Sequence, residues 1–323
     1  MKPTTTPYAD LSPDVVLAAV ESVGLLTDGR LLALNSFENR VYQVGIEEDK
    51  PVVAKFYRGG RWSDAAIAEE HAYALELVEA ELPMVAPRAF AGRTLLHHAG
   101  FRFAICPRQG GRAPELESAE NLAWMGRLLA RMHVVGARGT FVAREAIDCV
   151  SMIDAPVQSV LGSVLLPPAL HERYSRATDT LRDLISAAFA ACGEIRQLRL
   201  HGDCHAGNVL WTDTGPHFVD LDDARTGPAV QDLWMLATSS WAMDCLLEGY
   251  GEFRDFDRRE LELVEPLQVM RQIHHAGWIA KRWDDPAFPR AFGFAAQARW
   301  WEQHLDDLHE AIVKLGEPRD YET

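Results

Sequence analysis

The spacing of apolar residues predicts one helix and then a series of strands in the first third of the chain. Ser12 and Pro13 precede the apolar stretch DVVLAAVESV, and a capping serine followed by a proline in the first turn is a helix-start signal. Residues 31–34 and 41–46 indicate two strands joined by a short loop, and residues 51–58 a third strand with alternating positions. We therefore expect an antiparallel sheet preceded by a helix.

A longer helix and two more strands follow in the same region. Residues 64–80 carry apolar side chains at helical spacing, and Pro83 and Pro87 end that helix. Two β-like runs come next, near 88–96 and 101–106. The expected order is three strands, a helix and two strands.

Helical spacing dominates after the turn-rich sequence PRQGGR, which begins at residue 107. We place a boundary there, with a sheet lobe at 1–106 and a mainly helical lobe at 107–323. The expected class is α+β. The helices expected in the second lobe span 118–135, about 168–192, and about 229 to the C-terminus.

Composition narrows the class of protein without naming a function. The 323 residues are 48% hydrophobic and 24% charged, which is ordinary for a globular protein, and the net charge of −15 argues against a nucleic-acid partner. Five scattered cysteines without a CxxC pair indicate a reducing compartment. No stretch has the apolar length of a membrane span, and the N-terminus lacks the apolar core of a signal peptide, so we expect a cytosolic protein.

Three polar residues between 203 and 220 carry the strongest chemical signal. Asp203 is followed after four residues by Asn208 and after eleven more by Asp220. Strands at 209–212 and 217–220 would fold back and bring Asp220 close to Asn208. Amide and carboxylate oxygens suit Mg²⁺, and Asp203 could accept a proton from an attacking hydroxyl. Turn-forming Asp and Asn residues are the alternative, but the combination favours phosphoryl transfer from a nucleotide.

Lys55 is an ionisable residue in the middle of an apolar strand. It is either a solvent-facing residue or the lysine that holds the α- and β-phosphates of ATP. The second role needs a carboxylate from the next helix, where Glu69 and Glu70 follow. Glu70 shares its helix face with apolar residues, so we prefer it as the partner.

Two backbone segments could complete a nucleotide site. The loop at 35–40 lacks glycine, but its backbone N–H groups and the Ser36 hydroxyl could cover phosphate. The strand end at Ile105 and Cys106 could pair with the adenine edge, although any buried connecting strand would look the same.

Other interpretations stay open at this stage. A metallophosphoesterase would use His201 and His205 with further ligands; Cys204 could be redox-sensitive or a small buried residue. Tryptophans in the C-terminal part pack helices or line an acceptor groove with Asp284 and Asp285. The histidines that would have to supply the further metal ligands are His97, His98, His274 and His275, and the tryptophans considered for the groove are Trp278, Trp283 and Trp300.

The strings HGDCHAGN and DLDD resemble the signature of the aminoglycoside phosphotransferase and choline kinase-like superfamily. NSFENRVYQV, VVAKFYR, PRQGGR and VDLDDARTGPAVQDLWML are similar to its bacterial stress-response Ser/Thr protein kinases. The resemblance implies a two-lobed protein-kinase-like fold and a cytoplasmic monomer that uses ATP and Mg²⁺ to phosphorylate protein Ser/Thr residues. It implies that Asp203 is the proton acceptor, Asn208 and Asp220 are Mg²⁺ ligands, Ser36 belongs to the ATP site and Asp232 braces the catalytic loop.

Spacing points to a different acceptor. Only eleven residues separate Asp220 from Asp232, whereas regulated protein kinases use a longer activation segment there. That spacing favours a small-molecule hydroxyl kinase of the choline, aminoglycoside or homoserine type. A pseudokinase that only binds nucleotide is a third hypothesis. The presence of a suitable residue at every position that the chemistry requires argues against it. Asp222 and Asp223 have no role assigned from the sequence.

Overall fold

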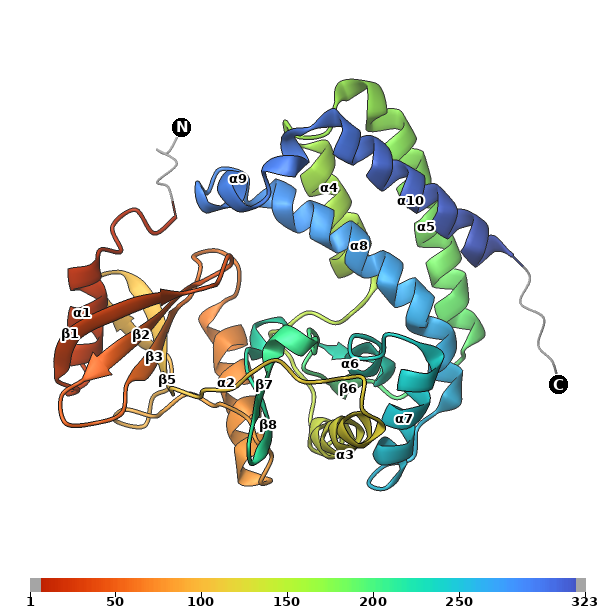
Figure 1. Cartoon of the computed structure of the whole chain (residues 1–323). Helices are drawn as coiled ribbons and strands as arrows, with labels where there is room; N and C mark the ends of the chain where they lie inside the picture. The colour runs from red at the N-terminus through yellow and green to blue at the C-terminus, as the bar shows by residue number, and fades with distance from the viewer. Residues whose placement is uncertain (1–6, 318–323) are drawn as a thin grey trace. The chain divides into compact units, whose positions relative to one another are not determined.

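The computed structural model describes residues 7–317 (Figure 1). The chain divides into two compact units. Unit 1 runs up to Glu145 and includes Gln197–Phe256, and unit 2 comprises Ala146–Arg196 and the chain from Asp257 onward. The boundary expected after residue 106 lies inside unit 1 and stays a prediction.

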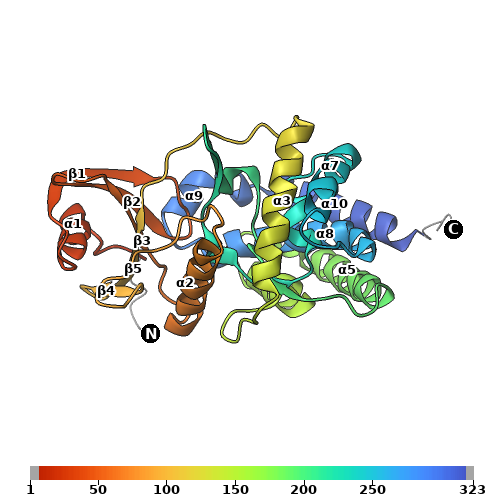
Figure 2. The same cartoon turned by 90° about the horizontal axis from the view of Figure 1, so that it is seen from below.

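Unit 1 contains an antiparallel sheet with the strand order β1-β2-β3-β5-β4, beside which α1 lies (Figure 2). Ser12 caps α1 as predicted, its hydroxyl accepting the Val15 N–H at 3.3 Å. The elements are α1 (Pro13–Glu21), β1 (Thr27–Leu34), β2 (Arg40–Ile46), β3 (Val52–Phe56), α2 (Asp64–Glu79), β4 (Leu96–His98) and β5 (Phe101–Pro107).

The two faces of β3 are buried against different helices, because successive side chains of a strand point in opposite directions. Val52, Ala54 and Phe56 belong to an apolar cluster with α1. Tyr57, just past the end of the strand, belongs to a second cluster with Ile67 of α2. Lys55 is two residues before Tyr57 and therefore points to the same face, so the strand directs its ammonium group toward α2.

The remainder of unit 1 surrounds a larger apolar core in which α3 crosses α7. Gly126 and Gly249 make this crossing possible, because a Cβ on either would lie 2.0 Å from a carbonyl oxygen of the facing helix. The elements are α3 (Ala119–Gly136), β6 (Leu198–Arg199), η3 (Ala206–Asn208), β7 (Val209–Thr212), β8 (Gly215–Phe218), η4 (Leu221–Asp223), β9 (Thr226–Gly227), α6 (Val230–Trp234) and α7 (Ser240–Gly251).

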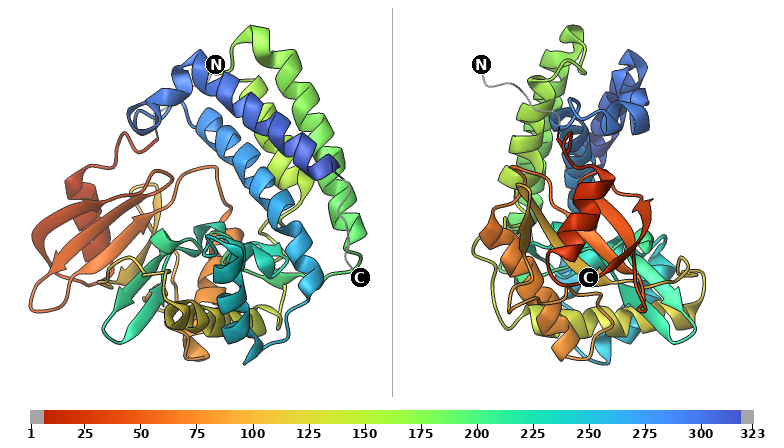
Figure 3. Two further views of the ribbon diagram at one scale, coloured as in Figure 1. Left: turned by 45° about the vertical axis from the view of Figure 1, so that its right-hand side comes forward. Right: turned by 90° about the vertical axis from the view of Figure 1, so that its left-hand side faces the viewer.

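Unit 2 is helical, and α5, α8 and α10 lie against one another within it (Figure 3). Its aromatic residues pack between helices: Trp301 is fully buried and donates its indole N–H to the Ala295 carbonyl at 2.9 Å. The elements are η1 (Val150–Asp154), α4 (Ala155–Leu161), η2 (Pro168–Leu170), α5 (His171–Ala191), η5 (Arg258–Leu263), α8 (Val264–Lys281), α9 (Ala287–Ala291), η6 (Gly293–Ala296) and α10 (Ala298–Gly316).

Two strand predictions and one helix prediction need correction. The strand expected near 88–96 is only β4, because residues 90–93 form a tight turn closed by hydrogen bonds between Phe90 and Arg93. The strand expected at 217–220 is β8, which starts at Gly215 because this glycine takes a φ of 113° after a two-residue turn. The helical run expected from 229 is broken into several helices, and the helical segment at 150–161 was not expected.

Within residues 7–317, none of the helices combines the length and apolar character that a membrane crossing requires.

Candidate active site

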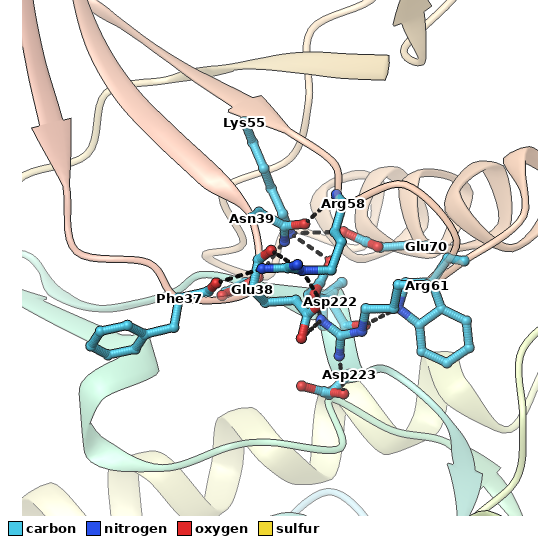
Figure 4. A network of polar contacts seen from close by, with 12 residues as sticks. Phe37, Glu38, Asn39, Lys55, Arg58, Arg61, Glu70, Asp222 and Asp223 are labelled. Atoms are coloured by element: carbon cyan, nitrogen blue, oxygen red, sulfur yellow. Dashed lines mark hydrogen bonds and ion pairs between the residues drawn. The ribbon is translucent and has the colours of Figure 1, made fainter. Parts of the chain in front are cut away.

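Three carboxylates surround the Lys55 ammonium group, and two of them, Glu70 and Asp222, are labelled in Figure 4. Its Nζ lies 2.9 Å from Asp220 Oδ1, 3.1 Å from Asp222 Oδ1 and 3.5 Å from Glu70 Oε1. Asp220 is 165 positions away in the sequence, so β3, α2 and the turn after β8 converge on one point. The helical carboxylate that approaches Lys55 is Glu70, on the face predicted for it.

Burial and charge act against each other in this cluster. Burial would lower the pKa of Lys55, but Asp220, Asp222 and Glu70 raise it well above its ordinary value. Burial raises the pKa of Glu70, with Lys55 opposing the shift. Burial would also raise the pKa of Asp222, yet Arg61 and Lys55 hold it below its usual range. Lys55 is thus a cation held by its neighbours.

The loop that precedes β2 contains no glycine and is held in place by ion pairs. The buried Glu38 forms an ion pair with Arg58 at 3.1 Å and lies 3.6 Å from Arg61. Arg61 also pairs with Asp222 and, at 2.5 Å, with Asp223 (Figure 4). These contacts tie the loop to the turn after Asp220. Ser36 is half-buried in the same loop.

Asp232 holds the loop that contains His201 and Gly202 through hydrogen bonds to main-chain groups. Its buried carboxylate accepts the N–H groups of His201 and Gly202, each at 2.8 Å, and lies 3.1 Å from His133 Nε2. Gly202 has a φ of 82°, and a Cβ there would lie 2.1 Å from the Asp223 carbonyl oxygen. Only glycine therefore allows this close approach of the loop to residue 223.

Asp203, Asn208 and His205 form a small hydrogen-bonded group in the loop. The Asn208 side-chain amide donates to the Asp203 carbonyl at 2.8 Å. His205 Nδ1 accepts the Gly207 N–H at 2.9 Å, which places its proton on Nε2, 3.5 Å from Asp203 Oδ2. The Asp203 side chain is 21% exposed, so its carboxylate is accessible.

Asp220 and Asn208 are neighbours because of the β7–β8 pairing. The Val219 N–H donates to the Asn208 carbonyl at 3.0 Å, directly beyond the last pair of the ladder. Asp220 takes a left-handed backbone conformation, φ 63°, which aspartate tolerates better than most residues. Its side chain is 50% exposed. An accessible carboxylate and an amide oxygen on these neighbouring segments are ligand types that suit a hard divalent cation, which also binds phosphate and water.

The predicted hinge residues lie near the C-terminal end of β5. Ile105 is fully buried, and its carbonyl accepts the Arg88 N–H at 2.7 Å. Cys106 pairs with Val53 of β3, and burial raises the pKa of its thiol to about 12. Neither side chain points to catalysis, so any role with adenine belongs to the backbone.

The residues of the alternative interpretations lie in the following environments. Cys204 is fully buried and burial raises the pKa of its thiol well above the ordinary range, as expected for a small core residue. His97 Nε2 lies 3.3 Å from Asp64 Oδ2, while His275 stacks on Trp278. In the described part of the chain, no group of three or more His, Cys, Asp or Glu side chains is arranged to hold a metal.

The sequence did not indicate a role in the site for Arg61, Arg144 or His133. The arginines reach residues far away in the chain, for which the sequence carries no signal. His133 had a weak signal, because it lies one helical turn after Leu129 on the buried face of α3. A buried histidine at such a position needs polar partners, which here are Asp232 and Tyr250.

Comparison with known sequences identifies relatives along nearly the whole chain. A sequence model of the "Phosphotransferase enzyme family" matches residues 30–264. Stress response kinase A of Escherichia coli (strain K12) is 42% identical over 316 residues, which cover 96% of this chain and 95% of the relative. Serine/threonine protein kinase RdoA of Salmonella typhimurium is 41% identical with the same coverage.

Solved structures share the fold at low sequence identity. Amicoumacin kinase hAmiN in complex with AMP-PNP, Ca²⁺ and Ami has a TM-score of 0.71 at 15% identity, covering 93% of each chain. A microcompartment-associated aminopropanol kinase has a TM-score of 0.64 at 20% identity, covering 91% of this chain and all of the other. The α+β, kinase-like fold expected from the sequence is confirmed.

Proposed function

The chain belongs to the phosphotransferase enzyme family and is a kinase, and we propose that it transfers the γ-phosphoryl group of ATP to Ser and Thr hydroxyls of proteins. The observation that supports ATP as the phosphoryl donor is that carboxylate oxygens of Glu70 and Asp220 both lie within 3.5 Å of Lys55 Nζ. A lysine on the third strand, a glutamate on the next helix and a metal-binding aspartate are the parts that place nucleotide phosphates in kinases.

Each residue then has a defined task. Lys55 neutralises the α- and β-phosphates, and Glu70 orients its ammonium group. Asp203 accepts the proton of the acceptor hydroxyl as the oxygen attacks phosphorus, and the bond to the leaving ADP oxygen breaks. Asp232 keeps the loop in place by holding the N–H groups of His201 and Gly202. Ser36 and the backbone of Ile105 and Cys106 contact the nucleotide in this proposal.

Asn208 and Asp220 are the residues that would hold Mg²⁺. When bound, the ion supplies positive charge to the phosphate oxygens. The amide oxygen of Asn208 remains for this purpose, because its nitrogen donates to the Asp203 carbonyl. Asp220 would exchange its contact with Lys55 for the ion, leaving Lys55 with Glu70 and Asp222.

Sequence relatives favour a protein acceptor. The curated relatives at 41–42% identity carry the names stress response kinase A and serine/threonine protein kinase RdoA, and they align over almost the whole chain. The solved structures named for small-molecule substrates are at most 20% identical here, which supports the shared fold alone.

A small-molecule hydroxyl acceptor is the second candidate, favoured by the segment between Asp220 and Asp232. Eleven residues separate these aspartates, and nearly all of them are buried. Such a segment offers no exposed strip for docking a peptide, as the longer activation segment of regulated protein kinases does. A protein acceptor would have to bind elsewhere.

Transfer of labelled phosphate distinguishes the two acceptors. The protein is incubated with γ-labelled ATP and Mg²⁺, with casein-like protein in one arm and choline, aminopropanol and homoserine in the other. We expect label on protein Ser or Thr that disappears with Asp203→Ala. Label only on a small alcohol would replace the acceptor, and nucleotide binding without any transfer would contradict the enzyme proposal.

A further inference from the structure

Arg144 lies in the segment that follows α3, and its side chain is fully buried in unit 1. Its guanidinium group donates to the carbonyl oxygens of Ala66 at 3.0 Å and Ala224 at 2.6 Å, and to that of Asp222. The Leu221 carbonyl lies 3.5 Å from Nη2. One side chain therefore joins α2 to the turn that follows Asp220.

Glu70 is shared between Arg144 and Lys55. Arg144 Nη1 lies 3.3 Å from Oε2, whereas Lys55 Nζ lies 3.5 Å from Oε1. A carboxylate held at both oxygens cannot rotate without losing one partner. The orientation that Glu70 presents to Lys55 thus depends on Arg144.

The backbone around Arg144 is held in return by α2. Glu69, the neighbour of Glu70, accepts the N–H groups of Val142 at 2.8 Å, Ala143 at 2.9 Å and Arg144 at 3.1 Å. Helix and segment are therefore fastened to each other in both directions. Glu69, the alternative to Glu70 as the expected partner of Lys55, makes these contacts instead.

Only arginine supplies this set of contacts. The guanidinium has five N–H donors in a planar fork, whereas lysine has a single ammonium group. The plane also lies over the Trp62 ring, 4.4 Å from its centre, and Trp62 donates its indole N–H to the Asp222 carbonyl at 3.0 Å. The contacts of Arg144 and Trp62 converge on the same turn.

We propose that Arg144 is a positioning residue for phosphoryl transfer, which fixes the Lys55–Glu70 pair relative to the turn that carries Asp220. The inference rests on the proposed ATP-dependent function. Kinase activity requires that the lysine–glutamate pair and the metal-binding aspartate are in place together. In this chain a buried arginine from outside both elements holds them together.

Removing this hold should affect nucleotide binding and rate more than folding alone explains. For Arg144→Met we expect kcat/KM for ATP to fall by about 10²-fold, because small misplacements of reacting groups have effects of that size. Most of the loss should be a higher KM for ATP. Arg144→Lys should recover little, since one ammonium group cannot reach α2 and the turn together.

The test compares Arg144→Met, Arg144→Lys, Glu70→Gln and the double variant Arg144→Met/Glu70→Gln. ATP binding without metal, steady-state kinetics with Mg²⁺ and urea unfolding are measured for each. Arg131→Met is the matched control, because Arg131 donates to the carbonyl of Ala80, the C-cap of α2, at 3.0 Å, far along the helix from Glu70. We expect the control to keep its KM for ATP even where its stability falls.

A double-mutant cycle separates positioning from general damage. If Arg144 acts through Glu70, the double variant should bind ATP no more weakly than the worse single variant. Additive losses, or wild-type KM and kcat in Arg144→Lys, would overturn the inference. Should Arg144→Met not fold, Arg144→Lys decides alone. A wild-type protein that binds no ATP refutes the proposed function instead.

Discussion

The two sides of the candidate site are held by different forces. The loop with Asp203 and Asn208 is fixed by hydrogen bonds to main-chain groups, through Asp232 and the β7–β8 pairing. The cluster around Lys55 is fixed by ion pairs between side chains that come from β3, α2 and the turn after β8. Main-chain bonds hold their geometry when a side chain is exchanged, but a buried ion pair that loses one partner leaves an uncompensated charge.

The difference predicts which substitutions separate activity from stability. On the loop side, a reacting side chain can be removed from a frame that persists. On the Lys55 side, each substitution changes the charge balance of its neighbours, so activity and stability should fall together. Four predictions test this contrast.

Asp203→Asn should show the largest effect. The rate of transfer should fall by about 10² to 10⁴-fold, because a proton acceptor of this kind contributes that much. The hydrogen bonds from Asp232 to the loop are made to main-chain groups of His201 and Gly202, so ATP affinity and the urea midpoint should stay near wild type. Kinetics with labelled ATP and urea unfolding check both.

Asp213→Asn is the control for that variant, since Asp213 lies exposed in the turn between β7 and β8. It should leave the rate unchanged. A large drop in stability for Asp203→Asn would mean that the loop depends on its side-chain charge after all, and the contrast between the two sides would disappear.

Arg61→Gln should destabilise unit 1 by about 3 kcal/mol, the lower part of the range for breaking a buried ion pair. Arg61 is almost buried and pairs with Asp222, Asp223 and Glu38, each of which would lose a cationic partner. Arg127→Gln, which breaks a solvent-exposed pair with Glu252, is the matched control and should show no measurable change. Equal urea midpoints for the two variants would refute a structural role for the Arg61 cluster.

The same contrast explains what the sequence could predict. Main-chain features depend on local residues: Ser12 and Pro13 at the start of α1, and the return of β7 into β8 beside Asn208. The Lys55–Glu70 pair was also accessible, because strand alternation and helix spacing give the direction of each side chain. The spacing of residues along the strand and the helix thus indicated one ion pair of the cluster, Lys55–Glu70.

The rest of the cluster depends on contacts between distant segments. Arg61 meets Asp222 across 161 positions, and Arg144 meets the same residue across 78. Nothing in the local pattern around an arginine states which carboxylate or carbonyl it will meet once the chain has folded. Asp222 and Asp223 therefore had no role until the structure placed them beside these arginines.

His71 should make the Lys55 side sensitive to acid. Burial lowers the pKa of His71 to about 3, and its ring nitrogens lie 2.7 Å from the Tyr57 hydroxyl and 2.8 Å from that of Thr94. The folded state binds fewer protons than the unfolded state between pH 6.5 and pH 3. Stability is therefore complete above pH 6.5 and is lost as the pH falls, by roughly 2 kcal/mol at pH 5.

Urea unfolding at pH 7 and pH 5 measures this loss, with His71→Gln as the comparison. The variant should lose less stability than wild type between the two pH values, whatever its stability at pH 7, because glutamine does not titrate. His304, whose pKa burial lowers to about 4, titrates in both proteins and cancels. Identical pH dependence in the two proteins would show that His71 does not stay neutral in the fold.

His205→Ala should show the smallest effect. The side chain is 41% exposed, and its Nδ1 accepts the Gly207 N–H, so water can take over this bond in the variant. The loss of one such hydrogen bond costs about 1 kcal/mol, and the rate should fall less than with Asp203→Asn.

His201→Ala is the informative comparison, because His201 is fully buried and its Nε2 lies 3.0 Å from the Val219 carbonyl, next to Asp220. Because the His201 ring contacts the strand end that precedes Asp220, we expect His201→Ala to reduce the rate more than His205→Ala does. Equal rates for the two variants would show that this contact does not help to place Asp220.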